Sequence, residues 1–380
     1  MRMVKIVNPF FTSPIIPDEY FCDREEESRL LVKLLVNGNN VVLISPRRMG
    51  KTGLIRHIYA SDGIAGKYNT FFADILHTTS VRELAYVLGK EVFDTLKPQG
   101  RKMLDEFLSV LKSLSLSLSY SPVSGMPEFS LHLGDITRPE ATLEEIFSYL
   151  EKSSKPCLFA VDEFQQVREY ADDANVEALL RSLVQRTANC RFIFSGSSRR
   201  IMSDMFTSSK RPFYNSADTV SLERIDREVY TSFAVGKFKE FGRTIEPEEV
   251  KRVYDMFDGY TYYIQRAMNV VFSNVEEGSS ADREIIDSSI DSVIQLNATS
   301  FRELLSNLKD KQKQVLAAIA KEGRASGVTS EAFIRKYSLP TASSIQNSLR
   351  KLIEDEIILR EGDEYSIYDK FLARWLEDIY

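Results

Sequence analysis

Residues 40–59 hold the stretch that decides the fold, NVVLISPRRMGKTGLIRHIY. Its short β-branched run 40–44 predicts a strand, and residues 52–59 return to helical spacing. The eight residues between them match the phosphate-loop pattern G-x-x-x-x-G-K-[ST], except that Ser45 stands in place of the first glycine. A loop between a strand and a helix can wrap phosphates with backbone N–H groups at the positive end of the helix. The stretch therefore predicts a phosphate-binding loop.

The chemistry of such a loop assigns each position a role. Gly50 lets the backbone approach the phosphates. Lys51, which we expect to be an exposed phosphate contact, reaches the β- and γ-phosphates, and Thr52 binds Mg²⁺. ATP and Mg²⁺ are thus the expected cofactors. The residues expected to bind the nucleotide are Ser45, Pro46, Arg47, Arg48, Met49, Gly50, Lys51, Thr52 and Gly53.

A second strand supplies a pair of acids. The run CLFAVD over 157–162 is an apolar strand, and Asp162 and Glu163 stand at its C-terminal end, where open α/β sheets bind ligands. We expect Asp162 to hold Mg²⁺ through water and Glu163 to polarise the attacking water. A solvent-exposed acidic pair at a strand end is the alternative.

A third strand contributes a hydroxyl. The strand predicted over 191–195 ends in Gly196-Ser197-Ser198, and the hydroxyl of Ser197 is placed to sense the γ-phosphate between the other two strands. A simple polar turn explains the same residues nearly as well. The catalytic candidates are therefore Glu163, Lys51 and Ser197.

Apolar strands and helices alternate along the first part of the chain. Further strand and helix patterns over 70–76, 80–96, 142–152 and 175–187 indicate a parallel sheet covered on both faces. Residues 113–120, SLSLSLSY, and residues 128–133, EFSLHL, alternate strictly and predict a hairpin inserted at about 113–133, with a Ser/Leu-rich linker as the alternative.

The rest of the chain has two parts. The first is helical in pattern, and the second is predicted to hold three helices followed by a small hairpin. Residues 223–308 are helical in pattern, with breaks at 242–247 and 278–280. Helices over 312–322, 330–337 and 341–355, followed by a hairpin near 357–367, are typical of a winged helix-turn-helix. We expect a core over 1–222, a helical lid over 223–300 and a winged-helix domain over 301–380.

Composition limits the classes of partner. The 380 residues carry a net charge of −6, so no overall cationic field attracts nucleic acid or anionic membrane. Three distant cysteines fit a reducing cytoplasm rather than a disulfide scaffold. Three scattered histidines imply no metal site, and no apolar run is long enough to span a membrane.

These motifs together resemble the archaeal-type ATPases, which are AAA-like P-loop proteins related to the STAND class. The resemblance covers nearly the whole chain and is carried by residues 21–25, FCDRE; 45–52, SPRRMGKT; 161–165, VDEFQ; 194–197, FSGS; 259–265, GYTYYIQ; and 365–375. It implies a sheet of order 5-1-4-3-2, a helical lid and a winged helix, used as a nucleotide-controlled switch.

The chain departs from the family pattern at several positions. Relatives usually have glycine where Asp23 and Ser45 stand and proline where Thr261 stands, which leaves the adenine contacts of the lid open. A Gly-Arg pair common in relatives after Pro212-Phe213-Tyr214 is replaced by Asn215-Ser216. The candidates for charge at the transition state are therefore Arg47, Arg48, Arg199 and Arg200.

Three functions compete on these observations. The first is a slow ATPase that acts as a switch on an unidentified protein partner. The second is an ATP-regulated DNA-binding protein, which charge disfavours because residues 311–380 hold 11 Lys+Arg and 11 Asp+Glu. The third is a scaffold that binds nucleotide without hydrolysing it, in which Glu163 would be dispensable. The sequence does not fix the oligomeric state.

Overall fold

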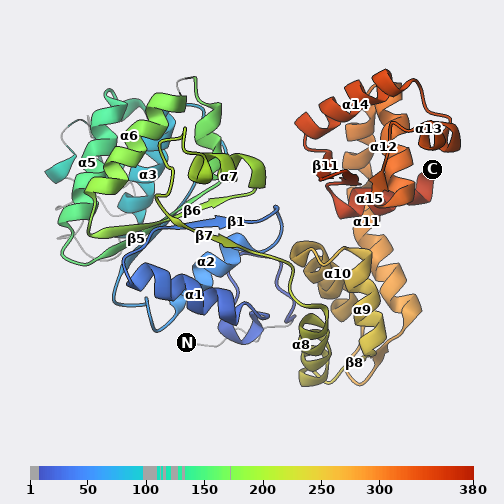
Figure 1. The fold of residues 1–380 in the computed structure, drawn as a ribbon. Coiled ribbons are helices and arrows are strands. Elements are labelled where there is room, and N and C mark those ends of the chain that lie inside the picture. Colours follow the sequence, from blue (N-terminus) through green and yellow to red (C-terminus); the bar gives the residue numbers. More distant parts are fainter. Residues whose placement is uncertain are drawn as a thin grey trace. The chain divides into compact units, whose positions relative to one another are not determined.

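The computed structural model describes residues 8–96, 109–111, 113, 117–120, 127–130, 133–171 and 173–380. The chain divides into two compact units. One unit is Ser13–Ile225, which contains the parallel sheet, and the other joins residues 8–12 to Asp226–Tyr380 (Figure 1). The chain therefore passes between the units twice, near residue 12 and near residue 225. We expected residues 8–12 within the core range 1–222, whereas they pack with the second unit.

Five parallel strands form the sheet of the first unit, in the order β2-β5-β6-β1-β7. Numbered along the chain, this order is 2-3-4-1-5, which is the expected 5-1-4-3-2 read from the other edge. The central strands are fully buried, as their continuous apolar runs predict. The strands are β1 (Val41–Ile44), β2 (Asn69–Asp74), β5 (Cys157–Asp162), β6 (Cys190–Gly196) and β7 (Asp218–Ser221).

Helices cover both faces of this sheet, which confirms the expected layering. Figure 1 shows α1 and α2 on one face and α3, α5 and α6 on the other. The short helix η4 (Phe164–Glu169) follows β5, and α7 follows β6. The α-helices are α1 (Glu25–Val36), α2 (Lys51–Ala60), α3 (Val81–Leu96), α5 (Pro139–Lys152), α6 (Asp173–Arg186) and α7 (Arg199–Thr207); the other short helices are η1 (Asp18–Tyr20) and η3 (Leu133–Asp135).

A separate strand pair lies within the alternating stretch. Strands β3 (Ser117–Tyr120) and β4 (Pro127–Ser130) pair antiparallel, with Ser117 opposite Ser130 and Tyr120 opposite Pro127. The remaining residues of the expected 113–133 hairpin lie mostly outside the described residues.

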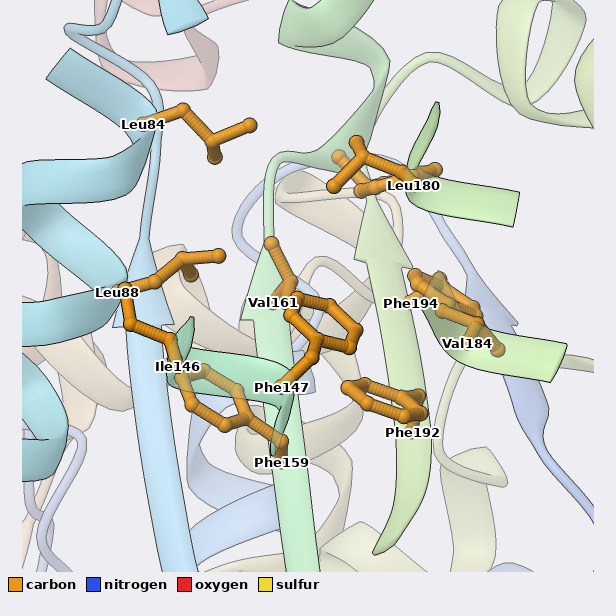
Figure 2. A pocket seen from close by; sticks show the side chains of 11 residues that line it. Leu84, Leu88, Ile146, Phe147, Phe159, Val161, Leu180, Val184, Phe192 and Phe194 are labelled. Carbon is orange, nitrogen blue, oxygen red and sulfur yellow. The ribbon is translucent and has the colours of Figure 1, made fainter. Parts of the chain in front are cut away.

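An apolar cavity lies between the sheet and helices α3, α5 and α6 (Figure 2). Its volume is about 20 Å³, close to the space that a single water molecule needs. Because its lining is entirely hydrophobic and no polar group faces it, we interpret it as a packing gap in the core and not as a ligand site. The lining residues are Leu84, Leu88, Ile146, Phe147, Phe159, Val161, Phe164, Leu180, Val184, Phe192 and Phe194.

The second unit begins with a helical subdomain, for which the sequence predicts a lid, and the N-terminal residues pack against it. The Asn8 amide donates to the carbonyl of Asn269, and the Asn269 amide donates to the carbonyl of Phe10, both at 2.7 Å. The Phe10 ring is fully buried against Phe238 and Phe272. The helices are α8 (Arg227–Glu240), α9 (Pro247–Met256), α10 (Thr261–Asn274) and α11 (Arg283–Ser306), and the two expected breaks carry a short parallel pair, β8 (Thr244–Ile245) and β9 (Ser280–Ala281).

The C-terminal part has the winged-helix arrangement that the sequence predicts. Three helices precede a hairpin, and a two-residue strand joins that hairpin to make a sheet of order β10-β12-β11. The last helix, α15, was not predicted. The elements are α12 (Asp310–Glu322), β10 (Ala325–Ser326), α13 (Glu331–Tyr337), α14 (Ala342–Glu354), β11 (Ile358–Glu361), β12 (Glu364–Ile367) and α15 (Lys370–Ile379).

Helix α15 is fastened to the turn that begins α10. The Lys370 ammonium, almost fully buried, donates to the carboxylate of Asp258 at 2.7 Å. The Phe371 ring packs edge-on against Phe257 and Tyr263. This contact joins the lid to the winged helix within one unit. None of the helices in the described part of the chain combines the length and apolar character that a membrane crossing needs.

Candidate active site

Parallel pairing brings three strand ends to one edge of the sheet. Ile44 at the end of β1 pairs with Gly196 at the end of β6, and Val161 in β5 pairs with Phe194 in β6. The loop after β1, the acids after β5 and the hydroxyl after β6 therefore lie together. The sequence predicts them at the ends of separate strands, and the register makes them neighbours.

The loop after β1 has the backbone that its glycine and serine positions require. Gly50 adopts φ +93°, a conformation that favours glycine, although a Cβ there would meet no atom within 4 Å. Ser45 is fully buried and is not among the positive-φ residues of the described chain, so a serine fits without strain. Its hydroxyl donates to the Pro46 carbonyl at 3.0 Å. Serine in place of the usual glycine therefore preserves the loop.

The expectation that Lys51 is exposed is wrong. Lys51 is only 6% exposed, and its ammonium donates to the carbonyls of Ser45 at 3.1 Å and Pro46 at 3.4 Å. Burial lowers the pKa of Lys51, although the carboxylates of Glu163 and Asp162 act to raise it. The cation is thus folded onto the carbonyls of its own loop.

Thr52 and Asp162 form the pair of oxygen ligands that the sequence suggests for Mg²⁺. The Thr52 hydroxyl donates to Asp162 Oδ2 at 3.0 Å, and the backbone N–H of Glu163 donates to Asp162 Oδ1 at 3.1 Å. One hydroxyl and one carboxylate suit Mg²⁺, which usually takes few protein oxygens and keeps water and phosphate oxygens as its other ligands. The donor set therefore fits the ion. Among the described residues, no group of three or more His, Cys, Asp or Glu side chains forms a metal cluster.

Glu163 is held in place by the loop after β6. Its backbone has φ +56°, in the left-handed region. Its Oε2 accepts from the hydroxyl of Ser197 at 2.6 Å, from the Ser197 backbone N–H at 3.3 Å and from the side-chain amide of Gln165. Burial acts to raise the pKa of Glu163, but these hydrogen bonds and the nearby cations Lys51 and Arg47 bring it below its ordinary value.

The four arginine candidates differ in their surroundings. Arg47 reaches the site, because its Nε donates to the Ser197 hydroxyl at 3.2 Å. Arg199 pairs with Glu223 at 3.0 Å, and both side chains are exposed. Arg48 adopts φ +68° within the loop. No contact of Arg200 with the site is present among the described residues.

Two polar residues at this edge received no role from the sequence. Gln165 lies in the quoted run 161–165, and its separation of two residues from Glu163 was the available signal. Asp74 ends β2 beside Asp162, where burial raises its pKa and the charges of Asp162 and Glu163 raise it further. Its position at the end of an apolar strand was the corresponding signal.

Solved structures share this fold over almost the whole chain. The Walker-type ATPase of Pyrococcus abyssi is 22% identical, with a TM-score of 0.62 over 97% of this chain and 99% of that chain. The Aeropyrum pernix ORC2 protein, in its ADPNP-ADP complexes, is 12% identical, with a TM-score of 0.60 over 97% of this chain and 95% of that chain. The Aeropyrum pernix ORC1 protein in complex with DNA is 13% identical, with a TM-score of 0.50 over 97% of this chain and 96% of that chain. At these identities the likeness concerns the fold.

Two family descriptions match parts of the chain. No curated protein matches the chain significantly. Residues 299–378 match a family described as a probable winged helix domain. Residues 21–267, more than half of the chain, match the family described as an ATPase domain predominantly from Archaea. This protein therefore belongs to that family of archaeal ATPase domains.

Proposed function

We propose that the protein is a Mg²⁺-dependent ATPase that converts ATP slowly to ADP and phosphate and acts as a nucleotide-controlled switch. The observation that carries this proposal is the hydrogen bond between Thr52 and Asp162, 3.0 Å long, beside the buried Lys51. It joins the phosphate loop to the acid strand at the edge of the sheet where open α/β folds bind their ligands.

Each residue then has a defined task. The backbone of residues 45–53 cradles the phosphates, and Lys51 turns from its carbonyl partners to the β- and γ-phosphates. Thr52 and Asp162 would hold Mg²⁺, which would supply positive charge beside the phosphates. Glu163 orients the attacking water with an ionised carboxylate, and Ser197 contacts the γ-phosphate.

The switch would act through the second unit. We propose the division into a lid over 223–300 and a winged helix over 301–380, with a protein partner on the winged helix and a cytoplasmic location suggested by the free cysteines. Closure of a lid on bound nucleotide is a common way to couple a γ-phosphate contact to a distant surface. The contact between Lys370 and Asp258 supports such coupling, because it fastens α15 to the lid.

DNA is a second candidate ligand, and we propose that it binds weakly. The ORC1 neighbour was solved in complex with DNA, and α14 of this chain holds the position of a recognition helix. However, Lys351 on α14 pairs with Asp355 at 2.7 Å, which neutralises one of the two cations of this helix, and Arg350 is the other. The tip of the wing carries Glu361 and Asp363, which repel phosphate.

Phosphate release with Mg²⁺ and with a chelator tests the proposal. The wild-type chain should release phosphate from ATP only when Mg²⁺ is present. Glu163→Gln should bind ATP but hydrolyse it about 10²- to 10⁴-fold more slowly, since it keeps the shape and removes the general base. Glu169→Gln, at an exposed position of η4, is the matched control and should behave as wild type. A wild-type chain that binds ATP but releases no phosphate would favour the non-hydrolysing scaffold.

A further inference from the structure

Three side chains at the strand ends form a closed set of hydrogen bonds. The amide nitrogen of Gln165 donates both to Glu163 Oε2 and to the Ser197 hydroxyl, the latter at 3.3 Å. Ser197 in turn donates to Glu163 Oε2 at 2.6 Å. A hydroxyl has one proton and two lone pairs, and Ser197 uses all three, because it also accepts from Arg47 at 3.2 Å. Without bound nucleotide, the Ser197 hydroxyl thus has a full set of partners, and the proposed contact with the γ-phosphate would replace one of them.

The orientation of the Gln165 amide is fixed by its neighbours. Turning the amide over would set its oxygen against the Glu163 carboxylate, so the nitrogen must face that group. The amide oxygen is buried and has no hydrogen-bond partner among the described residues. A buried polar atom without a partner costs free energy. The favourable contribution of Gln165 must therefore come from the two hydrogen bonds that its amide nitrogen donates.

Gly196 provides the space that Gln165 occupies. A Cβ at residue 196 would lie 2.5 Å from the Gln165 amide oxygen and 2.6 Å from the Met202 side chain, closer than any real contact. Gln165 itself is 8% exposed, so no alternative position in solvent is open to it without leaving this packing. The glycine that ends β6 and the glutamine of η4 therefore fit each other.

The two oxygens of Glu163 are thereby made unequal. All the hydrogen bonds that the described residues make to this carboxylate reach Oε2. A general base works best when its rotation is restricted and one lone pair is left to accept from water. The anchored Oε2 thus leaves Oε1 as the oxygen that can meet a nucleophile.

We propose that Gln165 is a positioning residue, which fixes the Glu163 carboxylate through Oε2 and connects it, through Ser197, to Arg47 of the phosphate loop. This inference rests on the proposed function, because it assigns a partner to the base of ATP hydrolysis. Gln165 touches neither nucleotide nor water in this role and acts through Glu163.

Gln165→Met tests the role, because methionine keeps the length of the side chain and removes both donors. We expect kcat for ATP to fall about 10- to 100-fold with KM unchanged, because the base keeps its carboxylate but loses its fixed orientation. A purely structural role would change kcat and KM together, so the split between them distinguishes the two.

Gln166→Met is the matched control. The Gln166 amide lies in the same short helix but donates to the carbonyl of Thr78 at 3.1 Å, away from Glu163. This variant should keep the kcat and KM of the wild type. Gln165→Glu, which keeps the shape of the native side chain, serves if Gln165→Met does not fold. It should lower kcat further, because a second carboxylate then faces Glu163 and repels it.

The outcomes separate this inference from the function on which it rests. Wild-type chain that neither binds ATP nor releases phosphate overturns both. Wild-type hydrolysis with a kcat for Gln165→Met within twofold of wild type overturns the positioning role alone. A raised KM with unchanged kcat also overturns it, since Gln165 would then act in nucleotide binding.

Discussion

Replacing Lys51 with methionine should separate nucleotide binding from fold stability. In the unliganded protein, the variant loses two hydrogen bonds from the ammonium to the carbonyls of Ser45 and Pro46. Hydrogen bonds to charged groups are worth about 1.5–3 kcal/mol each, but a buried cation also carries a desolvation cost, which is why burial lowers the pKa of Lys51. Since methionine fills similar space, we expect these terms to offset to within about 1 kcal/mol.

The liganded protein should behave very differently. ATP with Mg²⁺ at about 100 times its dissociation constant stabilises the wild type by about 2.7 kcal/mol. At about 2–4 °C per kcal/mol for a unit of this size, the melting temperature should rise by roughly 5–10 °C. If Lys51→Met weakens binding at least 100-fold, the same ATP concentration stabilises the variant by at most about 0.4 kcal/mol, or roughly 2 °C or less.

Differential scanning fluorimetry with and without Mg-ATP measures both quantities in one series. Lys67→Met is the matched control, because Lys67 is exposed and donates to the carbonyl of Asp62 at 2.8 Å near the end of α2. It should show the full wild-type shift. A full shift in Lys51→Met would refute the assignment of the phosphate loop. A loss of several kcal/mol in its unliganded form would refute the offset between hydrogen bonding and desolvation.

Three further predictions concern the second unit. Phe10→Ala should lower the free energy of unfolding of this unit by about 3–5 kcal/mol in chemical denaturation, because Phe10 is fully buried; a loss below 1 kcal/mol would contradict its place in the lid core. Lys370→Met should lower the free energy of unfolding by about 1–3 kcal/mol, because it breaks the ion pair with Asp258. A double-mutant cycle with Asp258→Asn should show positive coupling between the two residues. Additive effects would instead contradict the proposed link between α15 and the lid. DNA binding by the full chain should be weak, with a slope of about −2 to −3 in log K against log salt, and sub-micromolar binding with a steep slope would promote the DNA-binding function.

Hydrophobic periodicity predicted four of the five strands of the sheet, but it missed the edge strand β7. Strands β1, β5 and β6 are buried on both faces, so their sequences are continuously apolar and easy to recognise. Strand β7 has only Val220 buried among its four residues, and it pairs with β1 alone. An edge strand with three exposed residues carries no apolar run, so its existence followed only from the family resemblance.

The positions of the site residues along the elements were easier to predict than their surroundings. Spacing alone placed Asp162 and Glu163 at a strand end and Thr52 at the start of a helix, and parallel strands bring their C-terminal ends to one edge. Burial of Lys51 depends on how its own loop folds over it, and the contact of Gln165 depends on the glycine at residue 196. Such features arise from packing between segments far apart in the sequence, to which local patterns are blind.

The attachment of residues 8–12 to the lid could not be predicted for the same reason. The hydrogen bond from Asn8 to Asn269 spans 261 positions of sequence, and the apolar residues near the N-terminus fit the sheet core equally well. Sequence proximity therefore assigned this segment to the wrong neighbour.

The contact between Lys370 and Asp258, together with the length of helix α11, affects how the second unit can move. This helix of 24 residues packs on both α10 and α15, and at 1.5 Å per residue it is about 36 Å long. Because α11 packs on both α10 and α15, and Lys370 binds Asp258, the lid helices and the winged helix would move together as one rigid body. A tilt of about 10° at the lid would then carry the far end of α11 through roughly 6 Å. A small rotation of the lid helices would thus reach the winged helix as a shift of several ångströms.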